Sequence, residues 1–273
     1  MISISIVLYK QNSIDLEAIL TSISKITIEY KLFIIDNSPN NTLKDLFNDN
    51  KIIYTNNNKN VGFGAGHNIA INKSLEIDSK YHIVMNPDIY FDAGVIERLI
   101  EYIDSHQDTG LIMPEILYPN GQIQYLPKLL PGPLDLVIRR FFYTNNLFKN
   151  RINSYEMRSE QTKKSYESPI ISGCFSIFRT EVFYKIGLYD ERFFMYFEDF
   201  DISRRVNQKY KTVYYPLVSV YHNYERGAGK RIMLFQIFIM SAIRYFNKWG
   251  WVFDFSRKQV NAQAIQKFKE VIK

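Results

Sequence analysis

The sequence predicts an α/β fold in which a mainly parallel central sheet is flanked by helices. Segments of strand and helix character alternate between residues 2 and 105, which is the rhythm of β-α-β units. Hydrophobic residues make up 46% and charged residues 23% of the 273-residue chain, so it can bury a large core. Polar clusters follow the predicted strands, at the carboxyl ends where sheets of this kind bind ligands.

Apolar runs of strand length and segments of helical periodicity define the predicted elements. The predicted strands are Ile2–Leu8, Leu32–Ile35, Lys51–Thr55 and Tyr81–Met85. The predicted helices are Ser13–Ser24, with Ser13 as its N-cap, Gly66–Glu76 and Ala93–Ser105. Regular structure is expected again at Ile170–Arg179, in a helix after Asp199 and in a strand over Thr212–Tyr215. The polar clusters at strand ends are Tyr9-Lys10, Asp36-Asn37, Asn56–Asn60 and Asn86–Asp88.

Two segments differ in composition from the rest of the chain. Residues 132–168 are polar, basic and aromatic without a clear period, which predicts a flexible insertion near the ligand site. Just before them, Pro119-Asn120-Gly121 predicts a turn between strands. Residues 226–273 are basic and aromatic and predict a helical C-terminal extension, so the main domain is expected to span residues 1–225.

The C-terminal extension is basic in a chain whose net charge is +6. Basic, aromatic segments suit anionic lipid, phosphorylated ligands or nucleic acid, and equally suit a solvated charged helix. The apolar stretch Ile232–Ile243 is too short to span a bilayer as a helix. Trp249 and Trp251 follow it, a composition typical of membrane interfaces. A helix packed on the core, a helix on an anionic membrane surface and a homodimer contact all fit this stretch.

The single cysteine, Cys174, excludes an internal disulfide and a multi-cysteine metal site. The N-terminal residues lack the basic start and cleavage site of a signal peptide. We therefore expect a cytoplasmic protein, with peripheral attachment to the inner face of the cell membrane as an option that the extension allows.

The segment Asn60–Asn68 carries glycines at the alternate positions 62, 64 and 66. Glycines let the backbone approach a ligand and expose N–H groups, and the N-terminus of the following helix can face a phosphate. The spacing is neither the dinucleotide-binding G-x-G-x-x-G, because Ile69 stands at the last glycine, nor a P-loop. A tight turn between strand and helix is the structural alternative.

Asn86-Pro87-Asp88 places an amide and a carboxylate at the end of a predicted strand. Mg²⁺ and Mn²⁺ use few protein oxygens and bridge diphosphate oxygens, so the motif suits a metal site, although an Asx-Pro turn is the alternative. His222 follows a predicted strand, and as a ligand it would favour Mn²⁺ over Mg²⁺; a purely structural histidine is the alternative. Arg226, Lys230 and Arg231 can neutralise a diphosphate or remain solvated.

Three acids, Glu198, Asp199 and Asp201, lie beside an aromatic cluster that begins at Phe193. Apolar surroundings raise the pKa of a carboxylate toward the range of a general base. An acid in this place can also cap the helix that follows. We assign the cap to one acid and the chemistry to another.

In their order, these motifs resemble those of the inverting family 2 glycosyltransferases, which have a glycosyltransferase-A fold. The similarity is to the rhamnosyltransferase-like branch of bacterial polysaccharide synthesis and extends from residue 2 to residue 225. Four motifs carry it: Ile34-Ile35-Asp36-Asn37-Ser38, Asn60–Asn68, Asn86-Pro87-Asp88, and Gly187 with Phe193–Asp201.

The resemblance implies a non-processive enzyme that moves a hexose such as rhamnose or galactose from a dTDP- or UDP-linked donor to a cell-surface polysaccharide, of capsule or O-antigen type, or to a lipid-linked glycan. It implies Asp88 as ligand of Mg²⁺ or Mn²⁺, completed by His222, and Asp199 as the catalytic base with Glu198 beside it. Asp36 would hydrogen-bond the pyrimidine base. The implied donor-binding residues are Val7, Tyr9, Asp36, Asn60, Gly62, Gly64, Asn68 and Asn86.

Some features depart from the family pattern or support another function. Lys10 and Asn86 stand where Asn and Asp are frequent in the family, and Asn86 implies weaker metal affinity. The chain has no Gln-x-x-Arg-Trp motif and no membrane span, which argues against a processive enzyme. A nucleotidyltransferase would need a glycine-rich loop after the first strand, and residues 9–13 contain no glycine. A non-catalytic glycan- or lipid-binding partner in a synthesis complex is the alternative function. We expect no nucleic-acid partner.

Overall fold

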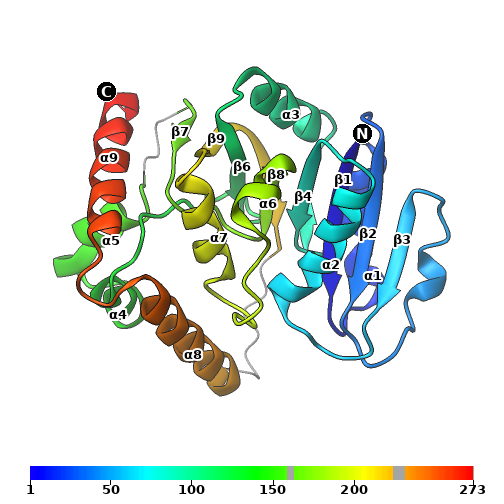
Figure 1. Ribbon diagram of the computed structural model, residues 1–273, viewed down its shortest axis with the longest axis horizontal. Helices are drawn as coiled ribbons and strands as arrows, with labels where there is room; N and C mark the ends of the chain where they lie inside the picture. The colour runs from blue at the N-terminus through cyan, green and yellow to red at the C-terminus, as the bar shows by residue number, and fades with distance from the viewer. Residues whose placement is uncertain (159–162, 224–230, 273) are drawn as a thin grey trace.

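The computed structural model describes residues 1–158, 163–223 and 231–272 (Figure 1). Nine strands in these residues form one sheet in the order β3-β2-β1-β4-β8-β6-β9-β5, and β7 pairs with β9 beside this path. The strands are β1 (Ile2–Leu8), β2 (Tyr30–Asp36), β3 (Ile52–Asn56), β4 (Tyr81–Met85), β5 (Ile89–Tyr90), β6 (Thr109–Leu117), β7 (Tyr166–Glu167), β8 (Phe175–Arg179) and β9 (Lys211–His222). The α-helices are α1 (Ser13–Ser24), α2 (Phe63–Glu76), α3 (Val95–Ser105), α4 (Pro133–Phe141), α5 (Lys149–Tyr155), α6 (Glu181–Ile186), α7 (Glu198–Asn207), α8 (Arg231–Trp249) and α9 (Phe255–Ile272).

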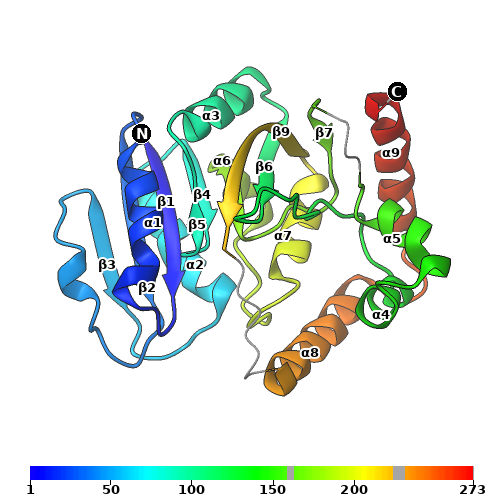
Figure 2. The ribbon, with the colours of Figure 1, turned by 180° about the vertical axis from the view of Figure 1, so that it is seen from behind.

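The N-terminal half of the sheet is parallel, and its inner strands β1 and β4 are buried. β1 pairs in parallel with β2 and β4, and β2 pairs in parallel with β3. Helices α2, α6 and α7 lie in front of the sheet in Figure 1, and α1 lies in front of it in the reversed view of Figure 2. The register of β1, β2 and β3 aligns Leu8, Asp36 and Asn56 in one row at the carboxyl ends. The polar clusters predicted to follow these strands therefore meet at one edge of the sheet.

The sheet as a whole is mixed: it is parallel from β3 to β4 and again between β6 and β9, and antiparallel elsewhere. β8 runs antiparallel to both of its neighbours, β4 and β6, while β5 and β7 run antiparallel to β9. β8 can enter in the reverse direction because residues 118–174 separate it from β6, in place of the single crossover helix that joins parallel strands. The α/β class with a helix-covered sheet is confirmed.

The N-terminal ends of α1, α2 and α3 differ from the predicted ones, and α3 begins at Val95 instead of Ala93. The N-cap of α1 is Asn12, whose backbone N–H donates to Asp15 Oδ2 (3.3 Å), and Ser13 already lies within the helix. α2 begins at Phe63, three residues before the predicted start, so Gly64 and Gly66 belong to its first turns. Gly62, with its positive φ, forms the turn before the helix, whereas Gly64 and Gly66 are helical.

Residues 132–168 contain more regular structure than predicted. The insertion contains the helices α4 and α5, which its sequence did not indicate by a clear period, and the short strand β7. Arg139 Nε donates to Glu156 Oε1 (2.9 Å), which ties α4 to the end of α5, and Leu136 packs against α8. Helices this short depend on such tertiary contacts. The turn predicted before them is present, where Tyr118 N donates to Gln122 O (2.8 Å).

The C-terminal helices pack on the rest of the fold. Tyr245 of α8 lies against Phe197 in the loop before α7, with ring centroids 5.4 Å apart. Phe268 of α9 packs on Tyr166 of β7, with centroids 4.7 Å apart. The boundary expected between residues 225 and 226 lies outside the described residues. In the part of the chain that the structure describes, no helix combines the length and apolar character needed to cross a membrane.

Candidate active site

The carboxyl ends of β1 and β2 form a polar corner. Asp36 is buried at the end of β2, where its carboxylate accepts hydrogen bonds from Ser38 N (2.8 Å) and Tyr54 Oη (2.7 Å). Burial and the hydrogen bond to Asp36 raise the pKa of Tyr54 above its ordinary value. Val7 is half-buried near the end of β1, and Tyr9 is exposed directly after that strand. The corner thus combines an exposed aromatic ring with a carboxylate that is fixed in place.

Asn60 shapes the loop between β3 and α2. Its Oδ1 accepts hydrogen bonds from Gly62 N (3.0 Å) and from Asn37 Nδ2 (3.4 Å). Asn37 Nδ2 also donates to Gly62 O (3.1 Å), and Asn57 Nδ2 donates to Asn37 Oδ1 (2.8 Å). These amides hold the loop beside the polar corner of Asp36.

The glycines bring the start of α2 against the loop before α7. Gly62 has a φ of +94°, which favours glycine, and a Cβ there would lie 2.4 Å from Phe194 O. A Cβ at Gly64 would lie 3.0 Å from Tyr189 Cβ. Phe63 N donates to Phe194 O (2.9 Å). The glycines therefore serve close packing, and the first N–H group of the helix is directed at protein instead of a phosphate.

Asn68 joins the same two segments. This buried side chain accepts a hydrogen bond from Tyr189 N (2.9 Å) and donates to Tyr189 O (2.9 Å) and Glu191 Oε1 (3.0 Å). Its amide was expected to line a donor and is instead used within the protein. Asn68 therefore fixes the position of the loop that leads to the acids of α7.

A second group of polar side chains lies beyond the carboxyl end of β4 and contains Asn86, Asp88 and His222. His222 Nε2 lies 3.3 Å from Asp88 Oδ1 and 3.4 Å from Asn86 Nδ2. On the other side of the ring, Nδ1 lies 3.1 Å from Gln124 Oε1, and Gln124 Nε2 donates to the carbonyl of His222 (2.9 Å). Because Gln124 uses its nitrogen as a donor there, its oxygen accepts from Nδ1–H. In the neutral ring, the lone pair of His222 Nε2 then faces Asp88.

This arrangement fits a divalent cation. Asp88 Oδ1 is buried and accepts no hydrogen bond from the described residues. It lies 3.3 Å from His222 Nε2, so a cation bound at Asp88 Oδ1 would have an imidazole nitrogen within reach as a second ligand. Over the described ranges, no group of three or more His, Cys, Asp or Glu side chains is placed to hold a metal. The chain thus offers few ligands and leaves the other positions to water and diphosphate, which is usual for Mg²⁺ at nucleotide sites.

Glu198 and Asp199 begin α7 and lie in different surroundings. Asp199 is half-buried, and its two oxygens accept hydrogen bonds from Phe200 N (2.9 Å) and Gly173 N (3.3 Å). Glu198 is buried, and its Oε2 has no hydrogen-bond partner in the described residues. Burial raises the pKa of both carboxyls, and repulsion from Asp199 raises that of Glu198 further. Asp199 is therefore the better placed of the two to act as an ionised base.

Lys128 provides a buried positive charge near Asp199. Its Nζ donates to Leu126 O (3.2 Å) and lies 5.8 Å from the centre of the Phe200 ring. Burial, followed by repulsion from Arg139, lowers the pKa of Lys128 to about 8, although attraction to Asp199 opposes this change. The same attraction lowers the pKa of Asp199, against the larger effect of burial.

Cys174 connects the two groups of acids. Its carbonyl accepts a hydrogen bond from Asn86 N (2.8 Å). Burial, with the negative charges of Asp88 and Asp199, raises the pKa of the Cys174 thiol to about 12, although a hydrogen bond with Ser172 opposes this. The thiol is therefore expected to be neutral, and Asp88 and Asp199 are both close enough to act on its pKa.

The third acid, Asp201, is a structural anchor. It is buried, and its Oδ2 lies 2.9 Å from Arg205 Nε. Its Oδ1 accepts a hydrogen bond from Trp249 Nε1 (2.8 Å) and lies 2.7 Å from Lys248 Nζ. Asp201 therefore holds α8 against α7.

The backbone just before the acids is strained. Tyr196 and Phe197 have φ values of +69° and +67°. Non-glycine residues in this conformation cost about 1–3 kcal/mol each and persist where the surroundings enforce them, often at functional sites. Here α8 covers the loop, and Ser241 Oγ donates to Met195 O (2.8 Å). The loop thereby fixes the direction in which Glu198 and Asp199 leave it.

The predicted site residues occupy neighbouring regions of one sheet edge. One region contains Asn86, Asp88, His222, Glu198 and Asp199. The polar corner contains Val7, Tyr9, Asp36 and Asn60. The contact between α2 and the loop before α7 is made by Gly62, Gly64 and Asn68. Gln124 and Lys128 were missed by sequence reasoning. Lys128 had a signal, since it stands next to the apolar pair Leu129-Leu130. Arg226 and Lys230, expected near a diphosphate, lie outside the described residues.

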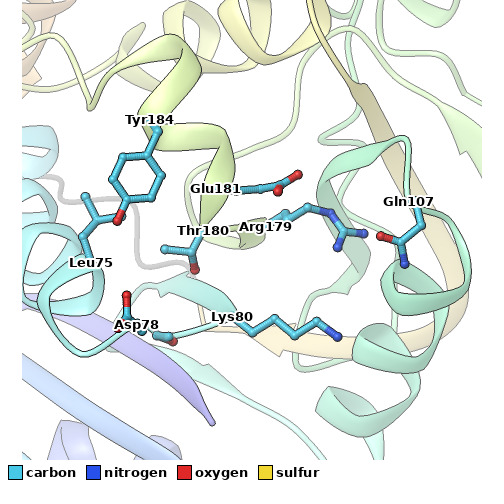
Figure 3. Close-up of a pocket in the computed structure, with 9 residues that line it drawn as sticks. Leu75, Asp78, Lys80, Gln107, Arg179, Thr180, Glu181 and Tyr184 are labelled. Carbon is cyan, nitrogen blue, oxygen red and sulfur yellow. The ribbon is translucent and has the colours of Figure 1, made fainter.

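A hollow of about 380 Å³ lies away from this site, at the amino end of β4 (Figure 3). Its cations are already engaged: Arg179 donates to Ile103 O (2.6 Å), and Lys80 forms an ion pair with Asp104. The residues that line it are Leu75, Asp78, Ser79, Lys80, Gln107, Arg179, Thr180, Glu181 and Tyr184. We assign no chemistry to this hollow.

Comparison with known proteins gives the following relatives. The chain is 27% identical over 186 residues to the N-acetylglucosaminyl-diphospho-decaprenol L-rhamnosyltransferase of Mycobacterium tuberculosis (strain ATCC 25618 / H37Rv), covering 63% of this chain and 58% of that protein. It is 26% identical over 212 residues to the low-salt glycan biosynthesis hexosyltransferase Agl10 of Haloferax volcanii, covering 76% of this chain and 62% of that protein. The chain therefore covers less than two thirds of the length of each of these relatives.

Solved structures similar in fold include GalNAc-T7 with UDP, GalNAc and Mn²⁺, with a TM-score of 0.62 and 20% identity over 82% of this chain and 43% of that one. S. aureus TarS 1–349 in complex with UDP has a TM-score of 0.58 and 16% identity over 97% of this chain and 71% of that one. These similarities support the predicted glycosyltransferase-A fold. The family model described as glycosyl transferase family 2 matches residues 3–187, more than half of the chain, and the protein belongs to this family.

Proposed function

We propose that the chain is an inverting, non-processive glycosyltransferase that moves a hexose, such as rhamnose or galactose, from a dTDP- or UDP-linked donor to a growing cell-surface polysaccharide or lipid-linked glycan. The observation that carries the proposal is that two adjacent residues contact both groups of acids. Gly173 N donates to Asp199 Oδ2 (3.3 Å), and Cys174 O accepts from Asn86 N (2.8 Å), two residues before Asp88. The named activities of the two relatives support the sugar class. The UDP in the two similar structures supports the donor class.

The donor would lie along the edge formed by the strand ends. Its base would lie at Val7, Tyr9 and Asp36, with the sugar and diphosphate running past Asn86. Asp88 and His222 would hold Mg²⁺ or Mn²⁺, which when bound stabilises negative charge on a leaving diphosphate. Asn60, Gly62, Gly64 and Asn68 would contribute by shaping the loop and helix that border the donor.

Asp199 would act as the general base. It removes the proton from the acceptor hydroxyl while that oxygen bonds to the anomeric carbon. The bond from this carbon to the diphosphate oxygen breaks on the opposite face, so the configuration inverts. Glu198, buried and held toward its protonated form, supports the position of the loop. We place this reaction at the cytoplasmic side of the membrane, where lipid-linked glycans are extended.

Calorimetric titration with UDP, dTDP and GDP, with and without Mn²⁺, tests the donor site. We expect metal-dependent binding of one diphosphate and loss of that binding in Asp88→Ala. Gln124→Ala should lower the affinity for Mn²⁺ about 10–100-fold, because a side chain that orients a ligating histidine contributes to metal affinity to that extent. Glu101→Ala, an exposed acid on α3, is the matched control and should bind like wild type.

Absence of diphosphate binding in the folded protein would remove the basis for the transferase proposal. It would favour the non-catalytic glycan- or lipid-binding partner. If the diphosphate binds equally well without the metal and in Asp88→Ala, the donor site stands, but the assignment of Asp88 and His222 as metal ligands is wrong.

Lys128→Met should shift the acid limb of the rate profile to higher pH. Asp199 must be ionised to accept a proton, so activity falls as the pH drops through its pKa. The charge of Lys128 lowers that pKa, and its removal therefore raises the pKa further above the ordinary value. The measurement is kcat/KM against pH in both proteins. A uniform loss of rate with an unmoved acid limb would show that Lys128 has only a packing role.

A further inference from the structure

We propose that the outward faces of α4 and α8, together with the turn between α8 and α9, form one surface that docks on a membrane containing anionic lipid. We call it the docking surface. Its principal apolar side chains are Val137 and Phe141 of α4, Met240 and Ile243 of α8, and Phe253 and Phe255 at the turn.

These side chains are exposed although they are apolar. Phe253 is 85% and Phe255 is 77% exposed. On α8, Met240 and Ile243 lie on the face opposite Ala242 and Tyr245, which pack on the protein. Single exposed apolar residues are ordinary, but their concentration on adjacent elements marks an interaction site.

The three elements lie next to one another. α4 and α8 are side by side in Figures 1 and 2. Leu136 of α4 packs against the cluster that contains Ala242, Tyr245 and Phe246 of α8. The guanidinium of Arg140 on α4 lies 5.2 Å from the centre of the Phe235 ring on α8. Arg257 Nη1 donates to Pro131 O (3.3 Å), which brings the turn to the start of α4. The exposed side chains therefore belong to one region of the molecule.

The acids of this region are already neutralised by neighbouring arginines. Asp135 is the only acid in the sequence between residues 132 and 155, and Asp254 is the only one between residues 231 and 258. Asp135 Oδ1 lies 2.7 Å from Arg151 Nη2. Asp254 Oδ1 lies 2.6 Å from Arg204 Nη2.

The remaining charge of the docking surface is positive. Arg140, Lys149 and Lys258 are exposed among or beside its apolar side chains. A surface that is both apolar and basic suits a bilayer with anionic headgroups. A second copy of this chain would oppose like charges across the same surface, which disfavours a symmetric dimer there.

The docking surface is coupled to the candidate active site through α8. The inner face of this helix covers the loop that leads to Asp199, where Ser241 Oγ contacts Met195 O (2.8 Å). Docking would therefore hold the proposed base close to the bilayer. The proposal concerns attachment alone and does not require the proposed transferase activity.

Flotation with vesicles tests the proposal. We expect wild-type protein to float with phosphatidylcholine vesicles that contain phosphatidylglycerol at low salt, and to float less at high salt or without the anionic lipid. The double variant F253S/F255S should lower the partition coefficient at least about tenfold, equivalent to about 1.4 kcal/mol. Ile14→Ser on α1, where the side chain is 80% exposed, is the matched control and should float like wild type.

Titration of the same variants with UDP separates attachment from the donor site, since F253S/F255S should retain the nucleotide binding of wild type. The proposal is overturned if wild-type protein stays in the lipid-free fraction at low salt, or if F253S/F255S floats unchanged. It is also overturned if light scattering shows a lipid-indifferent dimer that F253S/F255S converts to a monomer, because a second copy would then cover the surface.

Discussion

Asp199→Asn is expected to lower kcat by about 10²–10⁴-fold, the usual contribution of a general base. The amide keeps the size of the side chain but cannot take the proton of the acceptor hydroxyl. Calorimetry should still give wild-type affinity for the nucleoside diphosphate, because the proposed donor ligands are elsewhere. The acid limb of the kcat/KM profile should also disappear from the residual activity, since the group whose ionisation produced it is gone.

Glu198→Gln is the matched control for this prediction. Burial, followed by repulsion from Asp199, raises the pKa of Glu198 well above its ordinary value, so the side chain is expected to be neutral already. Replacing a neutral acid by a neutral amide should change the rate far less than Asp199→Asn. The opposite ranking of the two variants would make Glu198 the base.

The parallel half of the sheet was predictable because its signals are local. The predicted bounds of β1 and β4 match the structure, since each is an apolar-rich run of strand length that is followed by a polar cluster. The order of strand and helix also placed Asp36 and Asp88 at the same edge. The helix expected after Asp199 is present but begins at Glu198, so the acids lie in its first turn, and Phe197 stands at the N-cap where one of the acids was expected.

The remaining features depend on contacts between residues distant in the sequence. Gln124 orients His222 from 98 residues away, and no local pattern identifies such a pair. The start of α2 was misplaced because glycines usually interrupt helices, whereas Gly64 and Gly66 allow this helix to pack closely on neighbouring side chains. α4 and α5 are too short to give a strong periodic signal and gain stability from α8 and Glu156.

The C-terminal extension illustrates the same limit. Its composition left a packed helix, a membrane helix and a dimer contact open. The structure shows that α8 has two faces, one packed on the loop before α7 and one exposed. A buried ion pair between Arg204 and Asp254 holds the turn after α8 to the fold, and no local pattern in the sequence links these two residues.

Asp254→Ala is expected to destabilise the protein by about 3–5 kcal/mol, the usual result of leaving a buried charge without its partner. Arg204 donates to both oxygens of Asp254 (2.8 and 2.6 Å), and both side chains are 3% exposed. Its guanidinium also lies 4.2 Å from the Trp249 ring centre, so the pair fixes the junction of α7, α8 and α9. Urea unfolding followed by circular dichroism measures the change.

The double variant R204M/D254L separates the cost of an unpaired charge from a loss of packing. Replacing both partners by apolar side chains is often neutral or stabilising, so it should recover most of the stability lost in Asp254→Ala.

The pH dependence of the free energy of unfolding gives a second criterion. Burial alone would raise the pKa of Asp254, but the hydrogen bonds from Arg204 and Arg257 N lower it below the ordinary value. Wild-type stability from this pair is therefore complete above the unfolded-state pKa and is lost as the pH falls through the folded-state pKa, whereas R204M/D254L should lack this acid-dependent loss. A change in Asp254→Ala no larger than that of a surface substitution, about 0.5 kcal/mol, would mean that α8 and α9 are held by their aromatic contacts without help from the ion pair.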